Sequence, residues 1–364
     1  MVTKGRRGWK VALSILIGLG LLGGVLYWVG WRAIFSEMRS LGVAGICGVV
    51  GSVLLAMAGW TLSWWIILRS YGIRLPLGQV IGARLAGYAV SYLTPTLYFG
   101  GEPVRALMVT GKTDAPTTRV FATVFIERFL GGMSMIVFIL IGSFFAISSP
   151  ALPWEDKRLL ISGVGFITFW ILVGLINFAG NFKWISRLVR LLGFPLRRWR
   201  DPLARAADKV SETEDEIHAA FTAHWKGTLL AFLVQMVSTC FVYMRPQVFF
   251  YFSSGHAFTF PQLSLLFTLT VILLSFFLWI TPGGIGTGEA AIIGIFRLVA
   301  PSIPNHGAVA FSLLFKFAES ILVVLGLYYL AQRGIARIGR RRQAGEPAPP
   351  ASEGVNGSDG TRER

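Results

Sequence analysis

The chain carries one short phrase twice inside hydrophobic sequence: TPTLYFGGE at residues 94–102 and TPGGIGTGE at residues 281–289. In both copies a Thr-Pro pair begins the phrase, a Gly-Glu pair ends it, and an apolar run leads into it. Pro and Gly interrupt helices, and a Glu is expensive at membrane depth. Paired interruptions in corresponding hydrophobic segments indicate a transporter-type site built from broken helices. The alternative interpretation is two tight turns at ordinary helix ends.

Composition places the chain in a lipid bilayer. Of its 364 residues, 54% are hydrophobic and 14% are charged, against about 25% charged residues in soluble proteins. Several apolar runs exceed the roughly 18 residues that mark a spanning helix. The runs are continuously apolar rather than alternating, which excludes a transmembrane β-barrel. The predicted fold class is all-α: a polytopic membrane helical bundle with two broken or re-entrant helix units.

Apolar runs define the predicted spans and the shorter helices around the phrases. Runs at 77–93 and 103–110 flank the first phrase, and a run at 289–300 follows the second. The run at 11–31 exceeds the roughly 7–15 apolar residues of a signal peptide, so we predict an uncleaved first span. The long runs lie at 11–31, 41–68, 120–147, 159–180, 227–252, 262–280 and 306–331.

Lys and Arg residues set the predicted orientation. The formal net charge is +16, and basic residues gather beside hydrophobic segments at the N-terminus, at 69–74, at 183–209 and at 333–342. This placement favours anionic lipid headgroups over nucleic acid as their partner. The positive-inside rule puts both termini in the cytoplasm, with the protein in the inner (plasma) membrane. The span count then makes the two broken units enter from opposite faces, as in inverted repeats.

One membrane domain, an insert and a tail make up the predicted organisation. Residues 1–335 form the transmembrane domain, and residues 182–226 form its soluble insert. The insert begins with an amphipathic, interfacial helix near 184–192 and continues into an acidic stretch near 211–217 that is also predicted to be helical. Residues 336–364 are rich in Pro, Gly, Ser and Glu and are predicted to be a disordered cytoplasmic tail.

Few ionisable side chains lie inside the hydrophobic sequence, and each is a functional candidate that needs a partner. Glu127 and Arg128 are adjacent and point to different faces, so each needs a partner on another helix. The candidate partners are Arg105 or Arg84 for Glu127, and Glu102 or Glu289 for Arg128. Arg245 lies in the fifth long run. Lys316 and Glu319 share one helix face and are predicted to neutralise each other unless they serve a function.

These charges suit a phosphate-bearing ligand. Arg is a permanent bidentate donor to phosphate, and helix N-termini offer free N–H groups. In a purely structural role Glu102 and Glu289 cap helix starts; we favour capping for Glu289 and expect Glu102 to position Arg105. The predicted headgroup-binding residues are Arg84, Glu102, Arg105, Glu127, Arg128 and Glu289. The predicted broken-helix turns contain Thr94, Pro95, Gly100, Gly101, Pro103, Thr281, Pro282, Gly283, Gly284 and Gly286.

Other chemistries have little support in the sequence. There is no phosphate-binding P-loop, no HExxH and no GxSxG motif, so the sequence predicts no ATP motor, no metal and no cofactor. The two cysteines, Cys47 and Cys240, lie in apolar runs and form no disulfide framework.

The residues resemble a known family. Gly100-Gly-Glu-Pro-Val-Arg105, Glu127-Arg128 and Ile280-Thr-Pro-Gly-Gly-Ile-Gly-Thr-Gly-Glu289 resemble the lysylphosphatidylglycerol synthase transmembrane (flippase-like, UPF0104-type) family over roughly residues 10–335. The resemblance implies a membrane part that moves lipids, such as aminoacylated phosphatidylglycerol. This chain stops soon after its last span, where two-part members carry a soluble aminoacyl-transferase domain, so lipid aminoacylation is not predicted.

Three functions follow as hypotheses. The first is an integral membrane lipid translocase that moves a phosphate-bearing lipid, a phospholipid or a polyprenyl-linked lipid, and is not an enzyme. The second is a membrane scaffold that recruits a lipid- or glycan-modifying enzyme through the basic stretch at 183–209. The third, a membrane-embedded transferase, lacks an evident acid/base pair or a metal-binding DxxD motif.

Overall fold

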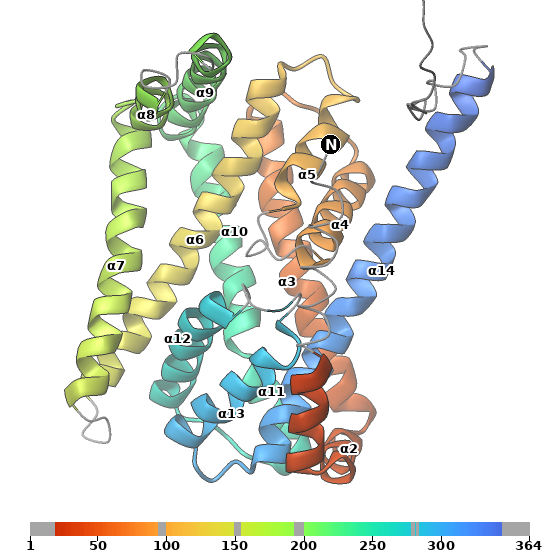
Figure 1. Ribbon diagram of the computed structural model, residues 1–364, viewed down its shortest axis with the longest axis vertical. Coiled ribbons are helices and arrows are strands. Elements are labelled where there is room, and N and C mark those ends of the chain that lie inside the picture. Colours follow the sequence, from red (N-terminus) through yellow and green to blue (C-terminus); the bar gives the residue numbers. More distant parts are fainter. Residues whose placement is uncertain are drawn as a thin grey trace, which may run out of the picture.

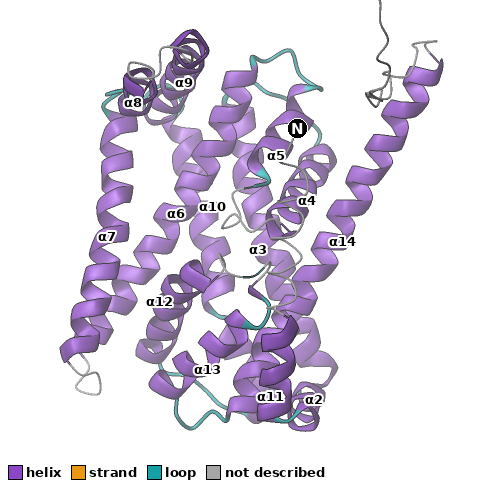
Figure 2. Ribbon diagram, in the orientation of Figure 1, coloured by secondary structure: helices purple, strands orange, loops and turns teal. Residues whose placement is uncertain are grey.

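The computed structural model describes residues 19–93, 100–148, 154–192, 200–277, 281 and 284–343. Within these ranges the chain forms helices joined by short loops, and no strand is present (Figure 2). The predicted all-α membrane bundle is therefore confirmed. A first helix spans Leu19–Val29. The others are α2 (Trp31–Ser40), α3 (Gly42–Ser70), α4 (Leu77–Leu93), α5 (Glu102–Thr110), α6 (Thr117–Ser148), α7 (Trp154–Ala179), α8 (Trp184–Leu192), α9 (Arg200–Phe221), α10 (Trp225–Tyr243), α11 (Arg245–Ser254), α12 (Phe260–Phe277), α13 (Thr287–Val299) and α14 (Asn305–Gln343).

Among the described residues, five stretches are long and apolar enough to cross a bilayer: α3, α6, α7, α10 with α11, and α14. The first helix and α2 make a sixth crossing only as a pair, because the chain bends by 81° between them. Gly30 lies at this bend with a φ of +94°, which side chains other than glycine rarely adopt. The helix Leu19–Val29 lies within the predicted span at 11–31, whose residues 11–18 are outside the described residues. The predicted run at 262–280 forms α12 (Phe260–Phe277), and its residues 278–280 lie outside the described residues.

The two broken units occupy opposite halves of the bundle (Figure 1). We call α4 with α5 the first unit, in the upper half of the view, and α12 with α13 the second unit, in the lower half. In each unit the two helices pack against each other. The helices α3, α6 and α14 run through both halves. This is the inverted placement expected from the positions of the two phrases. Residues 94–99, 278–280, 282 and 283, which include four of the predicted turn residues, lie outside the described residues.

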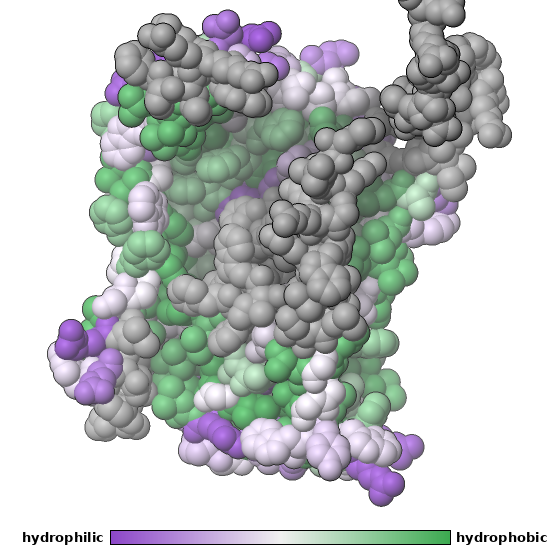
Figure 3. Space-filling view, in the orientation of Figure 1, coloured by the Kyte–Doolittle hydropathy of each residue, from purple (hydrophilic) through white to green (hydrophobic). Residues whose placement is uncertain are grey.

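Each half has its own hydrophobic core. The upper core is built around Trp64, Ile67 and Leu68 of α3, with Ile126 of α6. The lower core contains a cluster of aromatic rings, including Phe250, which stacks with Phe311 at a centroid distance of 6.0 Å. Large apolar side chains also cover the outer surface, where they form a hydrophobic zone between hydrophilic ends (Figure 3). The bundle therefore presents a lipid-facing belt around two packed cores.

The insert folds onto the upper end of the bundle as α8 and α9 (Figure 1). Glu214 of α9 is buried and accepts hydrogen bonds from the backbone N–H groups of Ile185 and Ser186, at 3.1 Å each. This carboxylate caps the start of α8, where free N–H groups and a partial positive charge need a partner. The acidic part of the insert thus holds the amphipathic α8 in place. At the other end of the chain, α14 continues to Gln343.

Candidate functional site

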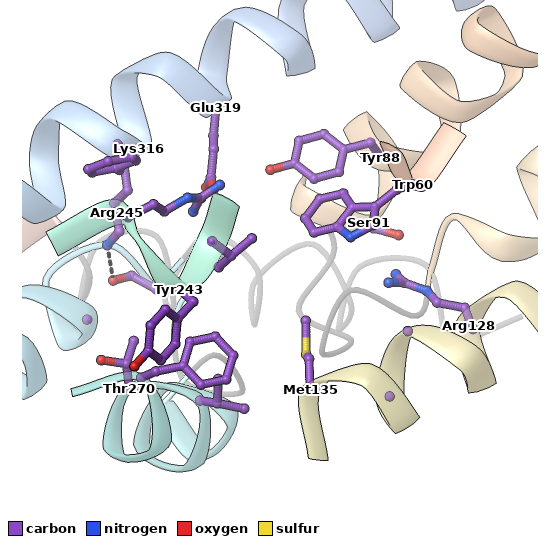
Figure 4. A pocket seen from close by; sticks show the side chains of 18 of the residues that line it. Trp60, Tyr88, Ser91, Arg128, Met135, Tyr243, Arg245, Thr270, Lys316 and Glu319 are labelled. Atoms are coloured by element: carbon purple, nitrogen blue, oxygen red, sulfur yellow. Dashed lines mark hydrogen bonds and ion pairs between the residues drawn. The ribbon is translucent and has the colours of Figure 1, made fainter. Parts of the chain in front are cut away.

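A cavity of about 540 Å³ lies between the two broken units. Five basic side chains and three carboxylates line it, so positive charge is in excess along its wall. Figure 4 shows Arg128, Ser91 and Trp60 on one side of the cavity, and Arg245, Lys316 and Glu319 on the other. The charged lining residues are Arg84, Glu102, Arg105, Glu127, Arg128, Arg245, Lys316 and Glu319.

Glu127 of α6 is the centre of the upper charge cluster. Its Oε2 accepts hydrogen bonds from Arg84 at 2.8 Å and from Arg105 at 2.7 Å, and its Oε1 accepts one from Gln235 at 2.9 Å. The Glu127 side chain is only 2% exposed. The guanidinium of Arg105 also lies over the ring of Trp64, with 4.4 Å between its central carbon and the ring centroid. The prediction that Glu127 pairs with Arg105 or Arg84 is confirmed for both.

One buried carboxylate therefore serves two buried guanidinium groups. Attraction between opposite charges is strong in a low-dielectric interior, and it offsets the cost of removing these groups from water. Trp64 adds a cation–π contact to Arg105. The cluster keeps a net positive charge, and Arg105 Nε is buried without a hydrogen-bond partner among the described residues.

Glu102 pairs with Arg128 rather than with Arg105. Its Oε1 accepts a hydrogen bond from Arg128 Nε at 2.6 Å, which ties the start of α5 to α6. This confirms one predicted partner of Arg128 and corrects the expectation that Glu102 positions Arg105, because Glu127 and the carbonyl of Val124 hold Arg105 instead. The Glu102 side chain is 18% exposed and faces the cavity.

A close contact between glycines of α4 and α5 brings Glu102 into position for its pair with Arg128. A Cβ added to Gly101 would lie 1.8 Å from the carbonyl oxygen of Gly87, so only glycine fits there. The N–H of Gly101 donates to Ser91 Oγ at 2.9 Å. Pro103 follows in the first turn of α5, where its missing N–H costs nothing. The GGEP sequence therefore produces a close helix crossing with Glu102 at the first helical position.

In the second unit Glu289 has a different environment. Its Oε2 accepts the Gly286 N–H at 2.7 Å, and its Oε1 receives Lys316 Nζ at 2.7 Å and Ser312 Oγ at 3.1 Å. The side chain is 1% exposed. Gly286 has a φ of +80°, and Gly284 has a φ of +63°. The expected helix cap at Glu289 is confirmed, and the two glycines supply the backbone turns before it.

The predicted pairing between Lys316 and Glu319 is wrong. Lys316 binds Glu289 and the Gly284 carbonyl oxygen, the latter at 2.6 Å. Glu319 accepts a hydrogen bond from Arg245 Nη1 at 2.9 Å. Each of these residues thus finds a stronger partner on another element than its neighbour on α14, because a tertiary contact can bring charges closer than the helix surface does.

Several lining residues are absent from the predicted headgroup-binding set. The sequence indicates Arg245 as a charge in an apolar run and Lys316 with Glu319 as a pair on one helix face, and it carries no prediction for Gln235. A single Gln in an apolar run is the one sequence signal that pointed to Gln235. Of the predicted turn residues, Gly100, Gly101, Pro103, Thr281, Gly284 and Gly286 are described, whereas Thr94, Pro95, Pro282 and Gly283 are not.

Thr281 joins the two ends of the second phrase. Its hydroxyl contacts Thr287 Oγ1 at 2.9 Å and donates to the carbonyl oxygen of Ile285 at 3.0 Å. The described part of the chain contains no group of three or more His, Cys, Asp or Glu side chains placed to hold a metal ion. The polar lining of the cavity consists of Arg, Lys and Glu side chains together with Ser, Thr, Gln and Tyr side chains.

The family model for the lysylphosphatidylglycerol synthase transmembrane region matches residues 11–326, which include both broken units and every charged residue of the cavity. The chain belongs to this family. As a member of the lysylphosphatidylglycerol synthase transmembrane family with several apolar spanning helices, it is a multi-pass membrane protein.

Two curated relatives match along most of their length. A UPF0104 membrane protein of Pyrococcus horikoshii is 25% identical over 306 residues, which cover 80% of this chain and 88% of that protein. A UPF0104 membrane protein of Methanothermobacter thermautotrophicus is 25% identical over 338 residues, which cover 88% of this chain and 95% of that protein. No solved structure matches the chain.

Proposed function

We propose that the protein is a lipid translocase that moves a phosphate-bearing lipid across the membrane without an ATP motor. The observation that carries the proposal is the cavity of about 540 Å³ between two broken units in opposite halves of the bundle, with basic side chains in excess on its wall. Half-helices that meet near the middle of a membrane are the usual construction of a transport site.

Arginine chemistry supports a phosphate headgroup as the ligand. A guanidinium group offers N–H donors in a planar fork that matches two phosphate oxygens. Arg105 has a buried Nε without a partner among the described residues, and it lines the cavity. A lipid phosphate that approached Arg105 would satisfy this N–H and the net positive charge of the cluster around Glu127.

The surface supports lateral entry of a lipid. In Figure 3 the hydrophobic zone is hollowed at mid-height, and hydrophilic residues lie deep in the hollow. Acyl chains would remain against the apolar exterior while the headgroup passes among the charges. The proposal involves no chemical step and assigns no catalytic residue.

The orientation belongs to the same proposal. The basic stretches around residues 69–74 and in α8, and the end of α14, all lie at the upper end in Figure 1. This common placement favours a cytoplasmic upper end and a cytoplasmic C-terminus in a cell's inner membrane.

Reconstitution tests the proposal. The purified protein would be placed in phosphatidylcholine vesicles containing a fluorescent phosphatidylglycerol, and transbilayer movement would be followed by access of a membrane-impermeant quencher. We expect Arg105→Gln to slow movement by about tenfold, since a hydrogen bond to a charged group is worth about 1.5–3 kcal/mol. Arg190→Gln is the matched control, because Arg190 lies in an exposed pair with Asp208 outside the cavity. Absence of movement in the wild type, with a panel of phosphate-bearing lipids, would refute the proposal.

A scaffold for a lipid- or glycan-modifying enzyme is the second candidate. The observation in its favour is α8, which exposes Trp184, Leu188 and Leu191 beside basic residues. Under this reading, alanine replacement of Leu188 and Leu191 abolishes function in cells, while Arg105→Gln has no effect. The translocase predicts the reverse.

A further inference from the structure

Arg245 lies at a helix break that faces the cavity. It is the first residue of α11, directly after α10 ends at Tyr243, and Pro246 follows in the first turn. The helix N-cap at Met244 has no side-chain cap. An Arg at this depth is costly unless it faces a partner or a polar cavity. Arg245 has both, because it lines the cavity and pairs with Glu319.

The contacts of Arg245 leave part of its guanidinium unused. Nη1 donates to Glu319, the central carbon lies 5.1 Å from the centroid of the Phe315 ring, and Nε is buried without a hydrogen-bond partner among the described residues. Arg105 on the other side of the cavity has the same arrangement: a Glu partner, an aromatic ring beneath the guanidinium and an unpartnered Nε. The cavity thus presents the same kind of anion-binding group at both of its sides.

Lys316 adds a second cation beside Arg245. Its Nζ is held by Glu289 and by the Gly284 carbonyl at the start of the second unit, and its side chain lines the cavity (Figure 4). Of the four charged groups here, the Glu289 carboxylate is the one that does not line the cavity. The cavity wall therefore carries two cations and one carboxylate on this side, and the counter-charge of Lys316 lies behind the wall, so the groups nearest to an anion in the cavity are mostly donors.

We infer that Arg245 and Lys316 form a second binding station for a phosphate group, distinct from the station at Arg105. The inference rests on the proposed function, since it places the same headgroup at two successive positions. The phosphate would accept hydrogen bonds from Arg245 Nε and from Lys316, while Glu319 keeps the guanidinium oriented. Transfer between the two stations would let the headgroup cross the bundle without losing its counter-charge.

Two variants at one ion pair separate a binding role from a structural one. Arg245→Gln removes the cation, and Glu319→Gln removes only its carboxylate partner. In the vesicle assay with fluorescent phosphatidylglycerol, we expect Arg245→Gln to slow movement by about tenfold and Glu319→Gln to slow it less, because the cation remains while its orientation loosens. Arg190→Gln, in an exposed pair outside the cavity, is the control that should leave movement unchanged. Equal losses in both variants, with equal loss of thermal stability, would identify a structural ion pair and overturn the inference. Unchanged movement in Arg245→Gln would overturn it as well.

Binding of radiolabelled inorganic phosphate to the purified full chain tests the station without transport. Binding that is weakened by Arg245→Gln, but not by Arg190→Gln, supports the station even when no lipid moves, and binding that is insensitive to Arg245→Gln counts against it. The same measurement separates the sources of the phosphate. Inhibition of lipid movement by millimolar phosphate points to a station that accepts free phosphate, whereas movement unaffected by phosphate points to the lipid headgroup.

Discussion

Glu102 and Glu289 end the same phrase and lie in the first turns of helices in corresponding units, yet they have different environments. Glu289 is enclosed by a backbone N–H, a hydroxyl and Lys316, whereas Glu102 faces the cavity and binds Arg128 through one oxygen. Its other oxygen is buried without a partner among the described residues. The same position of the phrase thus holds a buried carboxylate that caps a helix in the second unit, and a carboxylate that lines the cavity in the first. The phrase places its Glu in the first turn of a helix, and the surrounding helices determine which contacts that carboxylate makes.

The largest effect is expected from a substitution that breaks the charge cluster around Glu127. Glu127→Gln would leave Arg84 and Arg105 buried without a carboxylate, and we expect a loss of about 3–5 kcal/mol in the free energy of unfolding. Reversible unfolding in mixed detergent micelles measures it. Glu319→Gln is the matched variant in the other half of the bundle, because it breaks the pair with Arg245 of α11; that arginine is 15% exposed, and we expect less than about half of that loss. Equal losses would contradict the contrast between an enclosed cluster and an open pair.

The next effect concerns backbone contact. Gly101→Ala would push a Cβ into the carbonyl of Gly87, so α4 and α5 would have to separate, at a cost of about 1–3 kcal/mol. Gly294→Ala in α13 is the control, because a Cβ there meets no heavy atom within 4 Å. We expect it to be neutral or to stabilise by about 0.5–1 kcal/mol, since alanine favours helix. Thermal unfolding of both variants would decide, and a stable Gly101→Ala would contradict the described crossing.

Replacement of the carboxylates that end the two phrases, Glu102 and Glu289, directly tests whether their roles differ. Glu289→Gln leaves Lys316 without its counter-charge and weakens the cap, so we expect a loss of about 1–3 kcal/mol. Glu102→Gln disrupts a partly exposed pair and is expected to cost less than about 1 kcal/mol. Under the proposed function the order reverses for lipid movement, where Glu102→Gln has the larger effect. Parallel stability and vesicle measurements on both proteins would show whether the roles diverge as described.

Two serines each supply a single hydrogen bond, so the expected effects of replacing them are smaller than that of Glu289→Gln. Ser91→Ala would leave the buried N–H of Gly101 without its acceptor, at a cost of about 1–2 kcal/mol. Ser312→Ala removes one donor from Glu289, which keeps the Gly286 N–H and Lys316, and it is expected to cost about 0.5–1 kcal/mol. Chemical denaturation of the two variants compares them, and a larger loss for Ser312→Ala would reverse the ranking.

Much of the fold could be predicted because the bilayer imposes simple rules. Apolar length locates the spans, and the repeated phrases locate both broken units. The partners of Glu127 could be narrowed to Arg84 or Arg105, since an ionisable group at membrane depth must pair. The bend at Gly30 was missed because an isolated glycine does not show from sequence which φ it adopts.

The second side of the cavity was harder to predict. Lys316 and Glu319 are close along α14, which favoured an internal pair, yet the Gly284 carbonyl and Glu289 compete for Lys316 from another element. Nothing in the sequence shows which helix approaches Arg245 or Gln235, because that depends on how the helices pack across the bundle. Local spacing therefore predicted the caps and turns, and tertiary packing determined the ion pairs.

The helix α14 contacts both broken units, so it sets the distance between them as well as forming part of the cavity wall. Its Lys316 contacts the second unit and its Glu319 pairs with Arg245 of α11 in the same half, while Gly326 packs so closely on α4 that an added Cβ would lie 2.1 Å from the Leu85 carbonyl oxygen. Residues 319 and 326 are two helical turns apart, about 10 Å along the axis, so they lie on nearly the same face. A rigid helix that is held at both points fixes the distance between the two halves of the bundle. Any motion of one half relative to the other must therefore slide, tilt or bend α14.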